Sequence, residues 1–81
     1  MKAKVDVPFV PLNIAVLTVS DTRTLETDTS GQVFVDRLSE AGHQLAARVL
    51  LKDDLYKIRA QVATWIADDS VQVVLITGGT G

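Results

Sequence analysis

The stretch that most constrains the fold is residues 73–81, where an apolar run passes directly into a glycine-rich turn. Residues 73–77 include four apolar residues, three of them β-branched, which is typical of a strand buried on both faces. In the turn formed by Gly78, Gly79, Thr80 and Gly81, backbone N–H groups can approach an anion closely because only one side chain is present. Many α/β proteins hold phosphate with such a turn at the edge of a sheet.

Two strands and a helix are expected in the first half of the chain. Residues 13–20 form a near-continuous apolar run, which predicts a strand covered on both faces. Residues 44–51 alternate imperfectly between apolar and polar, which predicts a partly solvated strand nearer the edge of the sheet. Between them, apolar residues recur at helical spacing after Thr29 or Ser30, either of which can cap a helix that stops at Gly42.

A second helix is expected after Asp53 or Asp54, either of which can serve as its N-cap. Apolar residues at helical spacing predict the face that it buries, namely Leu55, Ile58, Val62, Trp65 and Ile66. We expect Trp65 in the core or at a subunit contact, because it lies on this apolar face.

The resulting order is strand, helix, strand, helix, strand, and right-handed crossovers make the strands parallel. The sequence therefore predicts an α/β fold with helices packed on a parallel sheet. Residues 1–12 contain Pro8 and Pro11 and are expected to form an extended N-terminal arm, with residues 13–81 belonging to one domain.

Composition excludes several classes of function. The net charge is −2 and Lys and Arg are scattered singly, so we expect no basic face for nucleic acid or a membrane surface. Arg48 and Arg59 are predicted to be exposed charges, and His43 is predicted to favour the dipole at the end of the first helix. The chain has no cysteine, which excludes disulfides and fits the cytoplasm, and no apolar run approaches the roughly 20 residues that span a bilayer.

Polar groups are expected to converge where the parallel strands end, because ligands bind at the carboxyl ends of such strands. Thr18 and Ser20 can donate hydrogen bonds there, beside the glycine turn. The carboxylates of Asp21, Asp53 and Asp54 suit a divalent cation such as Mg²⁺ that bridges to phosphate. The pattern favours a nucleotide with its metal, although a tight turn, a helix cap and a solvated acid are ordinary alternatives.

Four motifs then occur in a specific order: Leu-Thr-Val-Ser-Asp at 17–21, Asp-Thr-Ser-Gly at 28–31, Asp-Asp at 53–54 and Val-Leu-Ile-Thr-Gly-Gly-Thr-Gly at 74–81. Together they resemble the molybdenum cofactor biosynthesis proteins of the MoaB/MogA type, the molybdopterin adenylyltransferase family. The resemblance implies a three-layer α/β fold and a homo-oligomer, either a trimer or a hexamer. It also implies transfer of AMP from Mg-ATP to the terminal phosphate of molybdopterin, with release of pyrophosphate.

The resemblance further implies roles for individual residues. The turn at 78–81 is similar to the segment that binds the pterin phosphate. Thr18, Ser20 and Asp21 resemble the family residues that contact the adenylate and the pterin.

Acidic residues take the remaining roles in the family pattern. Asp53 matches the catalytic acid that handles Mg-ATP, so it is the candidate Mg²⁺ ligand, and Asp54 ranks second. Asp28 and Ser30 match a loop motif that positions the site.

In the family the glycine turn is followed by an Arg-Asp pair, whose Asp is the second catalytic acid, and then by Thr-Pro-Glu. We therefore expect residues 1–81 to be the N-terminal half of a member, with the remainder of the sheet elsewhere, and to be inactive alone. Two alternatives stay open: a non-catalytic molybdopterin-binding subunit of an oligomer, and an unrelated flavodoxin-like receiver domain with acidic loops.

Overall fold

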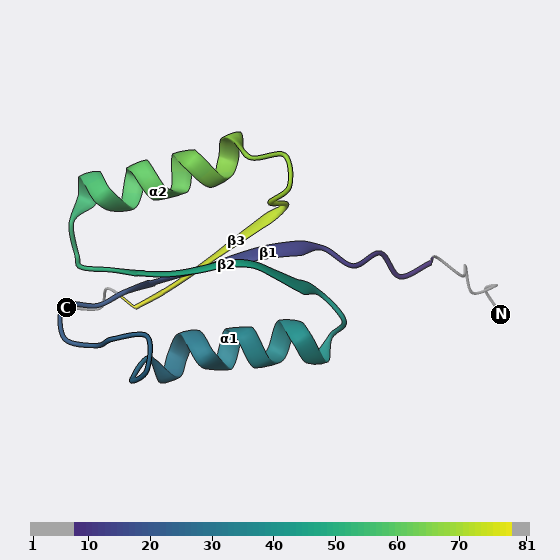
Figure 1. The fold of residues 1–81 in the computed structure, drawn as a ribbon, viewed down its shortest axis with the longest axis horizontal. Coiled ribbons are helices and arrows are strands. Elements are labelled where there is room, and N and C mark those ends of the chain that lie inside the picture. The colour runs from purple at the N-terminus through teal and green to yellow at the C-terminus, as the bar shows by residue number, and fades with distance from the viewer. Residues whose placement is uncertain (1–7, 79–81) are drawn as a thin grey trace, which may run out of the picture.

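Strand β1 is the centre of a three-stranded parallel sheet with the order β2-β1-β3. The computed structural model describes residues 8–78. Its elements are β1 (Asn13–Val19), α1 (Thr29–Glu40), β2 (Gln44–Leu51), α2 (Leu55–Ala67) and β3 (Val73–Gly78). Helices α1 and α2 lie on opposite faces of the sheet (Figure 1). The predicted α/β class, the element order and the place of β2 at an edge of the sheet in the described residues are confirmed.

The core lies on both faces of β1, because successive side chains of a strand point to opposite faces. Ala15, Leu17 and Val19 pack toward α2, where Trp65 is 4% exposed. Ile14 and Val16 pack on the other face with Leu38 of α1, completing a second buried cluster. Trp65 is therefore a core residue, one of the two positions predicted for it.

The prediction that the third strand is buried on both faces is wrong for the described chain. β3 begins at Val73, has a partner strand on one side only, and leaves Ile76 51% exposed. Two residues assigned to the inner face of α2 are also exposed, Leu55 at 62% and Ile66 at 75%. Leu55 stands at the first turn of the helix, and Ile66 follows the inward-facing Trp65 by one position, about 100° further round the helix axis.

Aspartates cap both helices. Asp28, rather than the expected Thr29 or Ser30, is the N-cap of α1, and its Oδ1 accepts a hydrogen bond from the Gly31 N–H at 2.9 Å. The helix begins one or two residues earlier than expected, which places Asp28 at the position where a side-chain oxygen can reach the first free N–H groups. Asp54, not Asp53, caps α2, because its Oδ1 accepts from the backbone N–H groups of residues 56 and 57 at 3.0 and 3.1 Å.

The end of the N-terminal arm lies against the turn between α1 and β2. The Leu12 N–H donates to Nδ1 of His43 at 3.0 Å, and the rings of Phe9 and His43 are 5.2 Å apart. His43 thus follows α1 as predicted and also holds the arm. Residues 1–7 of the predicted arm lie outside the described residues. Neither helix in residues 8–78 combines the length and the apolar character that crossing a membrane requires.

We predict that Gly42→Ala destabilises the protein by about 1 kcal/mol, because Gly42 has φ +88° and a Cβ there would lie 3.1 Å from the Phe9 ring. Urea denaturation measures the change. Gly42→Asn is the matched control, since Asn adopts the left-handed region more readily and should lose less. An alanine variant as stable as the wild type would contradict the prediction.

Candidate functional site

An open groove of about 350 Å³ lies where the parallel strands end. It is bounded by the end of β1, the loop after it, the first turn of α1, the residues after β2 and the end of β3. Seven of the residues proposed from the sequence line it, namely Thr18, Ser20, Asp21, Asp28, Ser30, Asp53 and Gly78. The structure does not bring Asp54 into the groove, and Gly79, Thr80 and Gly81 lie outside the described residues.

The carboxylate of Asp28 joins three elements at the inner wall of the groove. Asp28 is 3% exposed, and its Oδ2 accepts a hydrogen bond of 2.6 Å from the Thr18 hydroxyl in β1. Its Oδ1 accepts from the Gly31 N–H in α1, and Nη2 of Arg48 in β2 forms an ion pair with Oδ2 at 3.4 Å. Thr18 therefore uses its hydroxyl proton on Asp28, and both groups shape the groove wall.

These contacts set the ionisation of Asp28. Burial by itself raises the pKa of this carboxyl, since a charged group is less stable away from water. Hydrogen bonds from Thr18 and Gly31, followed by the hydrogen bond and positive charge of Arg48, outweigh burial and hold the pKa below its ordinary value. Asp28 is thus a carboxylate anion at neutral pH.

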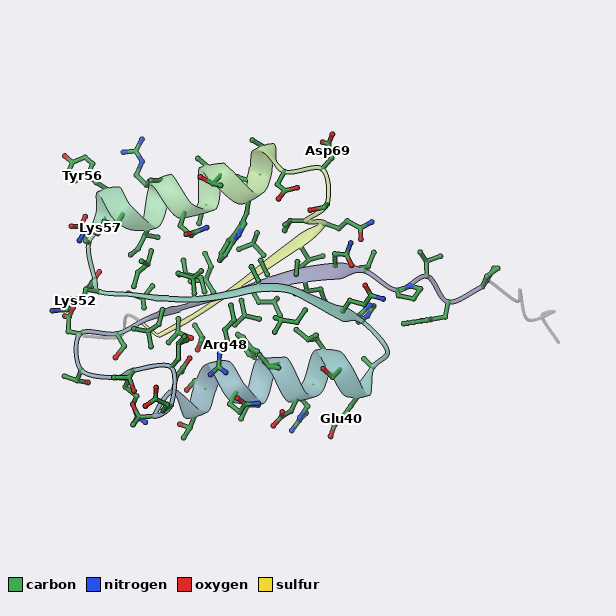
Figure 2. The ribbon with its side chains drawn as sticks, viewed as in Figure 1. Glu40, Arg48, Lys52, Tyr56, Lys57 and Asp69 are labelled. Atoms are coloured by element: carbon green, nitrogen blue, oxygen red, sulfur yellow. The ribbon has the colours of Figure 1, made fainter. Side chains whose placement is uncertain are left out.

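Arg48 corrects a prediction from the sequence, which placed it among the exposed charges. Its side chain is only 18% exposed and points from β2 toward α1 (Figure 2). It donates to Oε1 of Gln32 at 2.8 Å, to the Asp28 carbonyl at 3.1 Å and to the Leu25 carbonyl at 3.4 Å. Its Nε is buried without a hydrogen-bond partner in the described residues. The one available signal was its position in the middle of a strand whose residues after Gln44 are otherwise apolar, where a long charged side chain needs a partner.

The loop after β1 is held by bonds within itself. The Ser20 Oγ accepts from the backbone N–H groups of Thr22 at 3.3 Å and Arg23 at 3.0 Å. The Arg23 guanidinium donates to the Thr27 carbonyl at 2.7 Å, and the Thr24 N–H donates to the Thr27 hydroxyl at 2.9 Å. Because Ser20 acts as an acceptor in these bonds, its hydroxyl proton remains available to a ligand. Arg23, which the sequence argument did not single out, adds a positive charge to the groove lining.

Asp21 and Asp53 connect the ends of β1 and β2. The Asp53 N–H donates to Oδ1 of Asp21 at 3.0 Å, and both residues line the groove. Within residues 8–78, no group of three or more acidic or histidine side chains could hold a metal ion by itself. Mg²⁺ commonly takes one or two carboxylates together with water and substrate phosphates, so Asp21 and Asp53 fit a Mg²⁺ that arrives with a nucleotide.

Gly78 closes the groove at the end of β3. It pairs with Val19 of β1 and has φ +92°, and a Cβ there would collide with the Val19 carbonyl oxygen. Glycine is therefore required where the chain leaves β3, on the side of the sheet where the groove lies.

Comparison with known proteins shows the family to which the chain belongs. The family model described as "Probable molybdopterin binding domain" matches residues 15–81. The chain belongs to this family. The resemblance to proteins of the MoaB/MogA type is confirmed by relatives that carry the name molybdenum cofactor biosynthesis protein B.

The protein of that name from Escherichia coli strain K12 is 53% identical over 79 residues, which is 98% of this chain and 46% of that protein. Its counterpart from Bacillus subtilis strain 168 is 46% identical over 66 residues, covering 82% of this chain and 39% of that protein. A crystal structure of a molybdenum cofactor biosynthesis protein B matches with a TM-score of 0.84 at 42% identity, over 89% of this chain and 45% of the other. The chain spans less than half the length of these relatives.

We predict that Asp28→Asn lowers the free energy of unfolding at neutral pH by roughly 3 kcal/mol, because it leaves Arg48 without its anion and presents amide hydrogens to groups that donate. The loss should shrink on acidification. Since the folded pKa of Asp28 is lowered from 3.8, its contribution is full above that value and disappears as the pH falls through the lowered one.

Urea denaturation of both proteins between about pH 7 and pH 3 checks this expectation. Asp68, whose pKa is also lowered, by hydrogen bonds from the Ser70 hydroxyl and backbone, is present in both and cancels in the difference. A difference between the proteins that stays constant across this range would show that the Asp28 charge contributes nothing.

Proposed function

We propose that this protein acts in molybdenum cofactor biosynthesis in the cytoplasm, and that its groove binds molybdopterin together with Mg-ATP. The reaction proposed is transfer of AMP to the terminal phosphate of molybdopterin. An oxygen of that phosphate forms a bond to the α-phosphorus of ATP, the bond between the α-phosphorus and its bridging oxygen breaks, and pyrophosphate leaves. The observation that carries the proposal is a groove at three parallel strand ends, lined by carboxylates and a glycine, in a chain that matches a molybdopterin-binding family.

The chain offers donors to the negative phosphate groups of the substrates and carboxylates to the metal cation. Ser20 has a hydroxyl proton to donate to a phosphate or pterin oxygen, and Arg23 offers a positive charge on the same loop. Carboxylates repel bare phosphate, so Asp21 and Asp53 make sense only with a cation between them and the nucleotide. Bound there, Mg²⁺ would supply neutralisation of negative charge on the transferring group. We assign its protein contacts to Asp53 and Asp21, and leave Asp54 to the helix cap.

A second candidate is a non-catalytic molybdopterin-binding subunit of an oligomer. It is favoured by the finding that only Asp21 and Asp53 remain for a metal in the described groove, because Asp28 is already paired with Arg48. No group of three acidic or histidine side chains in the described residues could hold a metal. The two candidates share the groove and differ in whether pyrophosphate is released.

We predict that, in a full-length protein that carries residues 1–81, Asp53→Asn lowers pyrophosphate release from Mg-ATP and molybdopterin by at least about 100-fold, with molybdopterin still bound. The amide keeps the shape of the side chain and its backbone N–H bond to Asp21, but it removes the charge that faces the cation. Coupled detection of pyrophosphate measures the reaction, and quenching of pterin fluorescence measures binding.

Asp69→Asn is the matched control, because this carboxylate is exposed in the turn after α2 and should leave the reaction unchanged (Figure 2). If the full-length wild-type protein binds molybdopterin and releases no pyrophosphate, the non-catalytic candidate replaces the enzyme. If it binds neither molybdopterin nor Mg-ATP, both are wrong.

We also propose that the protein assembles as a homo-oligomer, and we predict a solution mass three or six times that of the protomer. The proposal is supported by apolar side chains that remain exposed on α2 and β3, namely Leu55, Tyr56, Ile66 and Ile76. Covering them removes apolar area from water, which favours association. Size-exclusion chromatography with light scattering measures the mass, and a monomer at micromolar concentration would refute the proposal.

A further inference from the structure

The side chain of Arg48 does not line the groove but bonds to segments that do. Arg48 lies in the middle of β2 and is not among the residues that line the groove. Its guanidinium lies between the sheet and α1 (Figure 2). Its hydrogen-bond acceptors are the Leu25 carbonyl, the Asp28 carbonyl and carboxylate, and Oε1 of Gln32. Every one of these belongs to the loop after β1 or to the start of α1.

This loop has little else to hold it against the sheet. Between Ser20 and Asp28 its hydrogen bonds are mainly internal, joining Arg23 and Thr24 to Thr27. Its described bonds to distant parts of the chain are one backbone bond at its start, from the Ser20 N–H to the Leu51 carbonyl at 2.8 Å, and bonds through three side chains. The three are Asp21 to the Asp53 N–H, Asp28 to Thr18, and Arg48. Arg48 is the one among these that reaches the middle of the loop, at Leu25.

We propose that Arg48 is a positioning residue for the groove, which sets the loop of residues 20–28 and the first turn of α1 against β2. It thereby places Arg23 and Ser30 along one wall of the groove, beside Ser20, which its own N–H bond to the Leu51 carbonyl holds at the end of β1. The positioning role of Arg48 is inferred from these contacts and does not depend on the reaction. The importance of Arg48 for adenylyl transfer rests on the function proposed above.

Two other roles fit the geometry less well. A direct phosphate contact would need free donors facing the groove, whereas Nη1 and Nη2 of Arg48 are already bonded to protein. A role in stability alone is weakly supported, because a largely buried ion pair seldom stabilises a fold more than apolar side chains of similar volume would. Here the ion pair also leaves the Nε buried and unpaired, which is unfavourable. What the guanidinium adds is a planar fork that fixes several oxygens of the loop at once.

The test compares Arg48→Met, Arg48→Lys and the control Arg59→Met in the protein as it is isolated. Methionine keeps the length of the side chain without its charge, and lysine keeps the charge without the fork. Arg59→Met removes one positive charge from an exposed position on α2. Hydrogen–deuterium exchange reports the amides of residues 20–31 and of β1 separately, and calorimetry reports the affinity for Mg-ATP.

We expect Arg48→Met to raise exchange in residues 20–31, including the Gly31 N–H, by roughly tenfold or more while the amides of β1 stay protected. Arg48→Lys should lie between Arg48→Met and the wild type, and Arg59→Met should match the wild type. The dissociation constant for Mg-ATP should rise by roughly tenfold in Arg48→Met.

Unchanged exchange in residues 20–31 would overturn the proposal, and so would an equal rise across β1, which would indicate general destabilisation. Should Arg48→Met not fold, Arg48→Lys decides by the same comparison. Failure of the proposed function would give a different result from failure of this inference. A wild-type protein that binds no Mg-ATP would refute the function, while the exchange data would still decide the role of Arg48.

Discussion

The carboxylate of Asp28 is the charge on which the arrangement of the groove depends. An almost fully buried anion is tolerated only when donors surround it, and here the donors come from β1, α1 and β2. Moving any of these elements relative to the others would leave a charge or a donor unpaired. Gly31 adds a steric condition, since a Cβ there would collide with Asp28 Oδ2. The point where the chain leaves the sheet and begins α1 is thereby held in one arrangement.

The sheet supplies the second condition for the groove. β1 is covered by a helix on each face and by a strand on each side, so in the described chain it is packed from all four sides. Parallel pairing sets Val19 at the end of β1 opposite Leu51 of β2 and Gly78 of β3, which brings the residues after each strand to the same edge. Asp21 and Asp53 belong to different loops and meet there because their strands end together.

Local patterns in the sequence were sufficient for the elements and for their order, because periodicity and turn residues report on neighbours along the chain. They also predicted which strand ends converge, since topology follows from the order. They failed for Arg48, whose partners lie 16 to 23 residues away in sequence and are recognisable only once α1 is docked on β2. They failed again for Ile76 and Ile66, because an apolar residue in the right period gives no sign of whether anything covers it.

The hydrogen bonds of the acidic residues distinguish their roles. Both carboxylate oxygens of Asp28 accept hydrogen bonds from the protein, and one oxygen of Asp54 accepts from two N–H groups of α2. Asp21 has one oxygen bonded to the Asp53 N–H and one oxygen left. The described chain offers the Asp53 carboxylate no hydrogen bond while its backbone is held in place by Asp21. A carboxylate with unused lone pairs, on a fixed backbone and at a groove, is better suited to a cation than one already bonded to protein, and in this respect Asp53 fits the proposed cation better than Asp28 or Asp54.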